Sequence, residues 1–141
     1  MEAADLEPLW VEFREVLREG ATYACDEATT LAEFERDWCG RGGEQWVADD
    51  GARRLGAYTL RAQQPGRGSH VATASYFVAA DARRRGVGER LGAHSLERAR
   101  ALGFEALQFN FVISTNTSAL RLWRRLGFEV VGELPRAFRH A

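Results

Sequence analysis

The chain has 141 residues, of which 45% are hydrophobic and 28% charged, and its formal net charge is −1. This length favours one soluble globular domain, and the small net charge argues against a partnership with nucleic acid or a membrane surface. No apolar run approaches the roughly 18 residues of a membrane span and no charged-then-apolar leader is visible, so we expect a cytoplasmic protein. Cys25 and Cys39 lack metal-ligand spacing, and we expect ordinary thiols and no metal site.

The N-terminal half predicts two helices followed by strands. Apolar side chains recur at helical spacing over residues 5–19, and Gly20 ends that pattern. Residues 30–39 predict a second helix, which Thr30 can cap together with Glu33. Short strands are expected over 45–49 and 55–62, and a Pro-Gly loop then leads to a longer strand over 70–79.

The C-terminal half alternates helices and strands. Helices are predicted over 87–102 and 117–126, and strands over 105–112 and 128–134. Because a whole helix joins the strand at 70–79 to the strand at 105–112, we expect these two to be parallel neighbours with a right-handed crossover. The order predicts an α/β (α+β) fold with a mixed central sheet flanked by helices.

An Arg-rich turn over residues 83–88 is the most informative segment of the chain. It reads Arg-Arg-Arg-Gly-Val-Gly, follows an apolar strand and starts a helix directly. Glycine lets the backbone turn sharply, and the unpaired N–H groups of a first helical turn lie at the positive end of the helix dipole. The pattern favours an anion site whose natural occupant is a pyrophosphate; the alternative is a turn that only starts a helix.

Two other kinds of nucleotide site fit this turn less well. A dinucleotide-binding Rossmann site needs an acidic residue at the end of the next strand, where this chain continues from Val112 to Thr115 without a carboxylate. A P-loop needs a Gly-Lys-Ser or Gly-Lys-Thr run, and the chain has no lysine.

Two motifs together resemble the Gcn5-related N-acetyltransferase (GNAT) family. Residues 83–88 fit its Arg/Gln-x-x-Gly-x-Gly/Ala signature. Residues 116–128, Asn-Thr-Ser-Ala-Leu-Arg-Leu-Trp-Arg-Arg-Leu-Gly-Phe, are similar to its Asn-x-x-Ala-x-x-Leu-Tyr-x-x-x-Gly-Phe pattern. The resemblance implies a single acetyltransferase domain over residues 1–141, with an acyl-CoA cleft between two splayed parallel strands.

The resemblance also implies which residues bind acetyl-CoA. The strand backbone would pair with the pantetheine arm, the Arg-rich turn would hold the pyrophosphate, and an N–H near Val78 would hold the oxyanion. Trp123 stands where the family often has the Tyr that protonates the leaving thiolate; an indole N–H is not a practical acid, so packing over the cofactor is the alternative role. The implied cofactor-binding residues are Phe77, Val78, Ala79, Arg83, Arg84, Arg85, Gly86, Val87, Gly88, Glu89, Asn116 and Trp123.

Few residues are candidates for the chemistry itself. His70 begins the strand that leads to the site, and an imidazole suits proton transfer, although a strand start is often only a solvated edge. Asn110 lies in mid-strand, where a buried amide would either bind the acceptor or bridge strands. We predict His70 and Asn110 as catalytic and Tyr23 and Asn110 as substrate-binding. Asp26, Glu27 or a chain of water molecules are alternative bases.

Two further segments, at residues 108–116 and 134–138, resemble a subgroup of the family that includes proline-analogue and amino-acid N-acyltransferases. This implies an acetyl-CoA-dependent N-acetyltransferase acting on a small amine, an amino acid or an analogue. The alternatives are a non-catalytic acyl-CoA sensor, a protein N-terminus acetyltransferase, and a domain without a CoA site. By the family's standard the chain looks short at both ends, so we expect an altered sheet order or a homodimer that covers the unpaired sheet edge.

Overall fold

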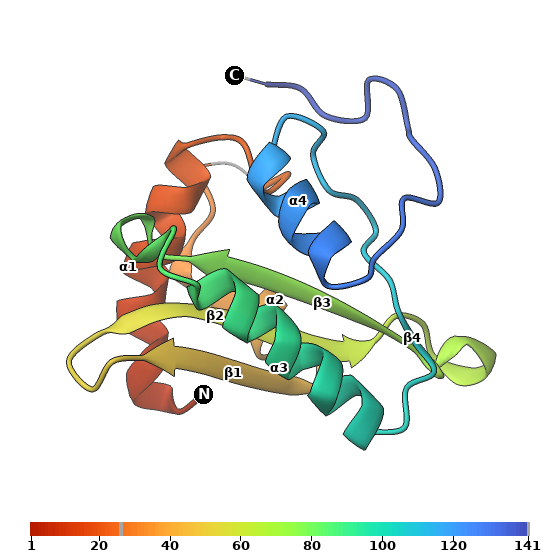
Figure 1. Ribbon diagram of the computed structural model, residues 1–141. Helices are drawn as coiled ribbons and strands as arrows, with labels where there is room; N and C mark the ends of the chain where they lie inside the picture. The colour runs from red at the N-terminus through yellow and green to blue at the C-terminus, as the bar shows by residue number, and fades with distance from the viewer. Residues whose placement is uncertain (26, 141) are drawn as a thin grey trace.

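Helices cover both faces of one four-stranded sheet in the computed structural model, which describes residues 1–25 and 27–140 (Figure 1). The elements in chain order are η1 (Ala3–Asp5), α1 (Leu6–Arg18), α2 (Leu31–Trp38), β1 (Glu44–Asp49), β2 (Arg54–Ala62), η2 (Gly66–Gly68), β3 (Val71–Val78), η3 (Ala80–Ala82), α3 (Val87–Ala101), β4 (Ala106–Leu107) and α4 (Thr117–Arg125).

The strands lie in the order β1-β2-β3-β4. Strands β1, β2 and β3 pair antiparallel, whereas β3 and β4 are parallel, with Val71 opposite Ala106 and Ala72 opposite Leu107. The long helix α3 joins β3 to β4, as a parallel pair requires. The mixed sheet and the parallel neighbours expected from the sequence are therefore confirmed.

Each face of the sheet carries its own apolar core. Helices α1 and α2 cover one face, where Phe13, Phe34 and Trp38 pack around Phe77 of β3. The ring centroids of Trp38 and Phe77 lie 5.1 Å apart in an edge-to-face contact. On the other face, Leu91 of α3 packs against buried side chains of β2 and β3. This arrangement follows from the helical spacing of the apolar residues, which puts one stripe of each helix toward the sheet.

The start of α2 is held by a reciprocal capping box. The Glu33 N–H donates to Thr30 Oγ1 at 3.3 Å, and the Thr30 N–H donates to Glu33 Oε2 at 2.8 Å. These two bonds satisfy N–H groups that a helix start would otherwise leave without a backbone partner. The predicted cap at Thr30 is confirmed.

Two predicted strands are largely absent from the part of the chain that the structure describes. Of residues 105–112, only Ala106 and Leu107 form β4, and the chain leaves β3 after the Gln108 N–H donates to the Ala72 carbonyl at 2.9 Å. The 128–134 segment forms no strand, and its Val131 is 98% exposed. A strand needs a neighbour for its N–H and C=O groups, and apolar alternation alone supplies none.

The sheet keeps a sequential strand order. Among the described residues no strand precedes α1, which the chain enters through η1. Pairing with a second subunit stays a prediction. No helix within the described residues is both long and apolar enough to span a bilayer.

Candidate functional site

The edge of β3 that faces β4 is open over most of its length. The Gln63 N–H donates to the Val71 carbonyl at 2.8 Å and the Ala79 N–H to the Leu55 carbonyl at 2.9 Å, so the odd-numbered residues of β3 direct their backbone groups to β2. In an antiparallel pair the intervening residues direct theirs the other way. The backbone N–H groups of Ala74, Tyr76 and Val78 therefore line the edge from which β4 has already diverged.

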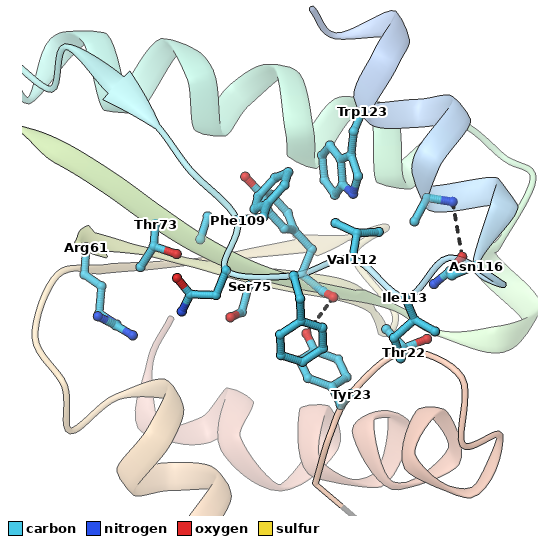
Figure 2. A pocket seen from close by; sticks show the side chains of 15 residues that line it. Thr22, Tyr23, Arg61, Thr73, Ser75, Phe109, Val112, Ile113, Asn116 and Trp123 are labelled. Carbon is cyan, nitrogen blue, oxygen red and sulfur yellow. Dashed lines mark hydrogen bonds between the residues drawn. The ribbon is translucent and has the colours of Figure 1, made fainter. Parts of the chain in front are cut away.

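This open edge forms one side of a cleft of about 210 Å³ (Figure 2). The segment from Phe109 to Ile113 forms the opposite side together with Asn116, Ala119 and Trp123 of the α4 region, and Thr22 and Tyr23 approach from the connection after α1. The cleft exists because β3 and β4 pair only at their first residues and then separate, as the resemblance implied.

An aromatic cluster closes the cleft on the α3–α4 side. The Trp123 ring lies 4.8 Å from the Tyr76 ring and 4.7 Å from the Phe109 ring, and Phe109 stacks on Phe128 at 4.7 Å. Such contacts stabilise the fold beyond the area that they bury. Trp123 is thus a packing residue in the cleft wall. The Tyr76 hydroxyl lies 2.7 Å from Ser95 Oγ, and burial raises the pKa of Tyr76 to about 12.

Gly92 allows α4 to approach α3 closely. A Cβ at this buried position would lie 2.5 Å from Leu126 Cδ1 and 3.1 Å from Trp123 Cζ3. Carbon atoms prefer separations of about 3.5–4.0 Å, so a side chain here would push α4 away. The glycine therefore contributes to the position of Trp123.

The Arg-rich turn presents the uncapped start of α3. Gly86, the N-cap residue, has φ 78°, and glycine has no side chain that could cap the helix. By contrast, Thr30 caps α2, and Asn116 Oδ1 caps α4 by accepting from the Ala119 N–H at 3.2 Å. The first N–H groups of α3 thus remain for an anion.

Some charged side chains around this turn are held by hydrogen bonds or ion pairs, and others are exposed. Arg83 donates to the Val78 carbonyl at 3.3 Å and to Glu19 at 2.8 Å, which ties the turn to the end of β3. Arg84 and Arg85 are exposed. Glu89 pairs with Arg125 at 3.4 Å, so a carboxylate near the helix start has a cation of its own.

Tyr23 lies in the cleft with its hydroxyl against β3. The hydroxyl donates to the Tyr76 carbonyl at 2.6 Å (Figure 2). Burial raises the pKa of Tyr23 well above its usual value, so the phenol keeps its proton at neutral pH. A protonated donor beside the open edge of β3 can orient an acceptor or hold the edge in place, but it is no general base.

Of the other residues that the sequence suggested for the chemistry, some line the cleft and others do not. Asn110 lines the cleft but is exposed rather than buried, and its Oδ1 accepts from Gln63 Nε2. His70 is exposed outside the cleft, where its carbonyl accepts from the Glu105 N–H at 2.9 Å. His70 immediately precedes β3, at the end of the strand that pairs with β4, before the two strands separate. Asp26 lies outside the described residues, and the exposed Glu27 does not line the cleft.

Of the three strand residues assigned to pantetheine, the structure brings only Val78 to the open edge. Phe77 pairs with Ala57 of β2 and packs its ring against α1 and α2, and Ala79 donates its N–H to β2. Their place on the open edge passes to Tyr76 and Ala74. Strand alternation could have indicated this, had the pairing of β2 with β3 been known.

The polar residues of the cleft that sequence reasoning missed include Arg61, Thr73 and Ser75. They lie on two neighbouring strands, and only the register of β2 against β3 brings them together. Within the described residues, no group of three or more His, Cys, Asp or Glu side chains could hold a metal ion.

Comparison with known proteins identifies the family. A family model for the acetyltransferase (GNAT) family matches residues 10–128. A curated relative, the N-acetyltransferase aca1 of Schizosaccharomyces pombe, is 37% identical over 78 residues, which are 55% of this chain and 37% of the relative. The chain thus spans little more than a third of that relative's length.

Solved structures cover almost the whole chain. A GCN5-related N-acetyltransferase from Kribbella flavida superposes with a TM-score of 0.93 at 41% identity, over 99% of this chain and 86% of the other. A GNAT superfamily phosphinothricin acetyltransferase from Sinorhizobium meliloti, solved with acetyl-CoA, superposes with a TM-score of 0.79 at 26% identity, over 94% of this chain and 74% of the other. By the family model and this agreement in fold, the chain belongs to the GNAT acetyltransferase family.

Proposed function

We propose that the protein transfers an acetyl group from acetyl-CoA to the amine of a small acceptor, an amino acid or an analogue. One observation carries the proposal: the open backbone edge of β3 leads, through η3 and the Arg-rich turn, into the uncapped first turn of α3. A ligand with amide groups at one end and a pyrophosphate at the other matches this sequence of donors, and CoA, whose pantetheine arm is joined to its pyrophosphate, has that order.

The backbone supplies most of the donor site. The N–H groups from Arg84 to Glu89 would bind the pyrophosphate, because they lie in the turn and the first turn of α3. The backbone groups of Tyr76 and Val78 would bind the amides of the arm. Asn116, whose Oδ1 caps α4, contributes mainly by holding α4 and Trp123 against the cleft.

Acetyl transfer then needs three events in the cleft. A neutral amine attacks the thioester carbonyl, an N–H donor holds the developing oxyanion, and the thiolate leaves. A backbone N–H of the open edge of β3, further from α3 than the residues that bind the arm, would serve the second event. No His, Asp or Glu is found among the described residues that line the cleft, and we propose that a water molecule receives the proton of the amine.

A second candidate function is acyl-CoA sensing without catalysis. The same composition of the cleft favours it, because Trp123 cannot act as an acid and Tyr23 is committed to the Tyr76 carbonyl. The two functions differ in one respect: a sensor binds acetyl-CoA without releasing thiol.

An end-point assay separates these functions. The purified protein is incubated with acetyl-CoA and a panel of amino acids and simple amines, and free thiol is followed with a chromogenic reagent. We expect acceptor-dependent thiol release with at least one amino acid. Acetyl-CoA binding by calorimetry with no release for any acceptor would favour the sensor and contradict the proposal.

The predicted homodimer has a separate test. Val131 and Leu134 of the unpaired 128–134 segment are 98% and 81% exposed, and exposed apolar extended segments favour pairing with another chain. Light scattering on dilute protein should give the mass of a dimer, whereas a strict monomer would contradict this prediction.

A further inference from the structure

We propose that Arg61, together with the hydroxyl groups of Thr73 and Ser75, binds a carboxylate of the acceptor. This inference rests on the proposed acetyl transfer and specifies the acceptor for it. The acceptor would be a free amino acid or a close analogue that keeps a carboxylate near its amine.

The register of the sheet places these residues in one row. Arg61 of β2 lies opposite Thr73 of β3, and Thr59 lies opposite Ser75. Side chains that face each other across an antiparallel pair share one face of the sheet. This is the face to which Phe77 directs its ring, toward α1 and α2, whereas Tyr76 faces α3 and α4. Figure 2 shows Arg61, Thr73 and Ser75 in succession along the cleft.

Arg61 is the one charged side chain among the described residues that line the cleft. Its guanidinium donates to the Ala62 carbonyl at 3.2 Å, and no carboxylate of the described residues lies within ion-pair distance. Other half-buried arginines are paired: Arg54, on the same strand, binds Asp5 at 2.6 Å, and Arg98 binds Glu44 at 2.6 Å. A partly desolvated cation without a counter-ion favours an anionic ligand.

The chemistry of the row suits a carboxylate. A guanidinium can donate two parallel hydrogen bonds to the two oxygens of one carboxylate, and neighbouring hydroxyls can donate further bonds. Thr73, which is buried, and Ser75, which is exposed, both belong to β3 and line the cleft. Their hydroxyl groups therefore lie on the same strand. Nearby, Asn110 accepts from Gln63, which leaves the amide N–H groups of Asn110 as additional donors at the same end.

The position of Arg61 also separates the acceptor from the CoA pyrophosphate. Thr73 lies five residues before the end of β3 at Val78, a distance of about 17 Å. The carboxylate end of the acceptor would therefore lie far from the start of α3, with the amine directed toward the edge at Tyr76. A peptide N-terminus carries an amide where a free amino acid carries its carboxylate, so this arrangement selects against protein acceptors.

Arg61→Met tests the inference when each acceptor is compared with its own amide. For the amino acid, we expect kcat/KM to fall about 10- to 100-fold, mostly through KM, because a charge-assisted contact is lost. For the amino-acid amide, which has no carboxylate, the change should be less than about threefold. Arg61→Lys should retain part of the preference. Arg100→Met, an exposed arginine of α3, is the matched control and should leave both values unchanged.

The outcomes distinguish this inference from the proposed function. If the wild-type protein acetylates neither acceptor, the proposed function fails. If it acetylates amino acid and amide equally well, or if Arg61→Met lowers both equally, acetyl transfer stands and the carboxylate site is refuted. Thermal melting and acetyl-CoA affinity report folding, and if Arg61→Met does not fold, Arg61→Lys and Thr73→Val carry the comparison.

Discussion

Replacement of Gly92 by alanine tests whether close contact between α3 and α4 positions the cleft wall. The added Cβ would lie 2.5 Å from Leu126 Cδ1, about 1 Å too close, and 3.1 Å from Trp123 Cζ3, about half an ångström too close. Leu126 can rotate away. Trp123 cannot, because the rings of Tyr76, Phe109 and Phe128 surround it.

Two effects of opposite sign decide the stability of this variant. Alanine is the better helix former by about 1 kcal/mol, whereas overpacking costs about 1–3 kcal/mol. We therefore expect Gly92→Ala to lower the free energy of unfolding by up to about 2 kcal/mol, measured by urea denaturation. Acetyl-CoA affinity should fall as well, because displacement of α4 moves Trp123 away from β3.

Two companion variants separate the effect of helix propensity from the effect of overpacking. Gly88→Ala, whose Cβ would meet Leu122 no closer than 3.4 Å, reports helix propensity with little overpacking. In a Leu126→Ala background, Gly92→Ala should be better tolerated by about 1 kcal/mol, since part of the clash is gone. Full stabilisation by Gly92→Ala, additive with Leu126→Ala, would show that the helices are not in close contact and would refute the reasoning.

Further variants test the acetyl-CoA site, the role of Trp123 and the loss of stability at low pH. Gly86→Asp should weaken acetyl-CoA binding at least about 30-fold in calorimetry, because it places a negative charge where the pyrophosphate binds; unchanged affinity would exclude an anion site there. Trp123→Phe should keep kcat within about threefold, and a hundredfold loss would mean that the indole N–H takes part in the chemistry. The Glu2 N–H and Arg54 hold the pKa of Asp5 below its usual value, so the stabilisation by this carboxylate is present at neutral pH and is lost as the pH falls below about 4. In Asp5→Asn, the free energy of unfolding from denaturation curves should depend less on pH in this acid range, and an unchanged pH dependence would count against the role of Asp5.

Apart from the parallel pairing of β3 with β4, which the joining helix α3 indicates, the features that the sequence predicted correctly depend on neighbouring residues in the chain. The capping box of Thr30 and Glu33 and the glycine turn before α3 are set by residue types a few positions apart. The 128–134 segment was predicted as a strand because its residue types favour one, but a strand also depends on a neighbour that no local pattern reveals.

The candidate site shows the same limit for single residues. His70 was assigned by its chemistry and its predicted place at a strand start, yet it precedes β3 and does not line the cleft. Arg61 reads in the sequence as a solvated charge in a strand, and only its register opposite Thr73 shows that it faces the cleft. The proposed donor site was predictable because it uses a local backbone motif, whereas the proposed acceptor site depends on contacts between strands.

The most direct test of the account is the rate at which the wild-type protein releases CoA thiol from acetyl-CoA in the presence of a free amino acid. We predict a rate that saturates with the amino acid, yields the N-acetylated product by mass spectrometry, and is lost in Gly86→Asp. A protein that binds acetyl-CoA but gives the same thiol release with and without every amino acid and simple amine tested would contradict the account.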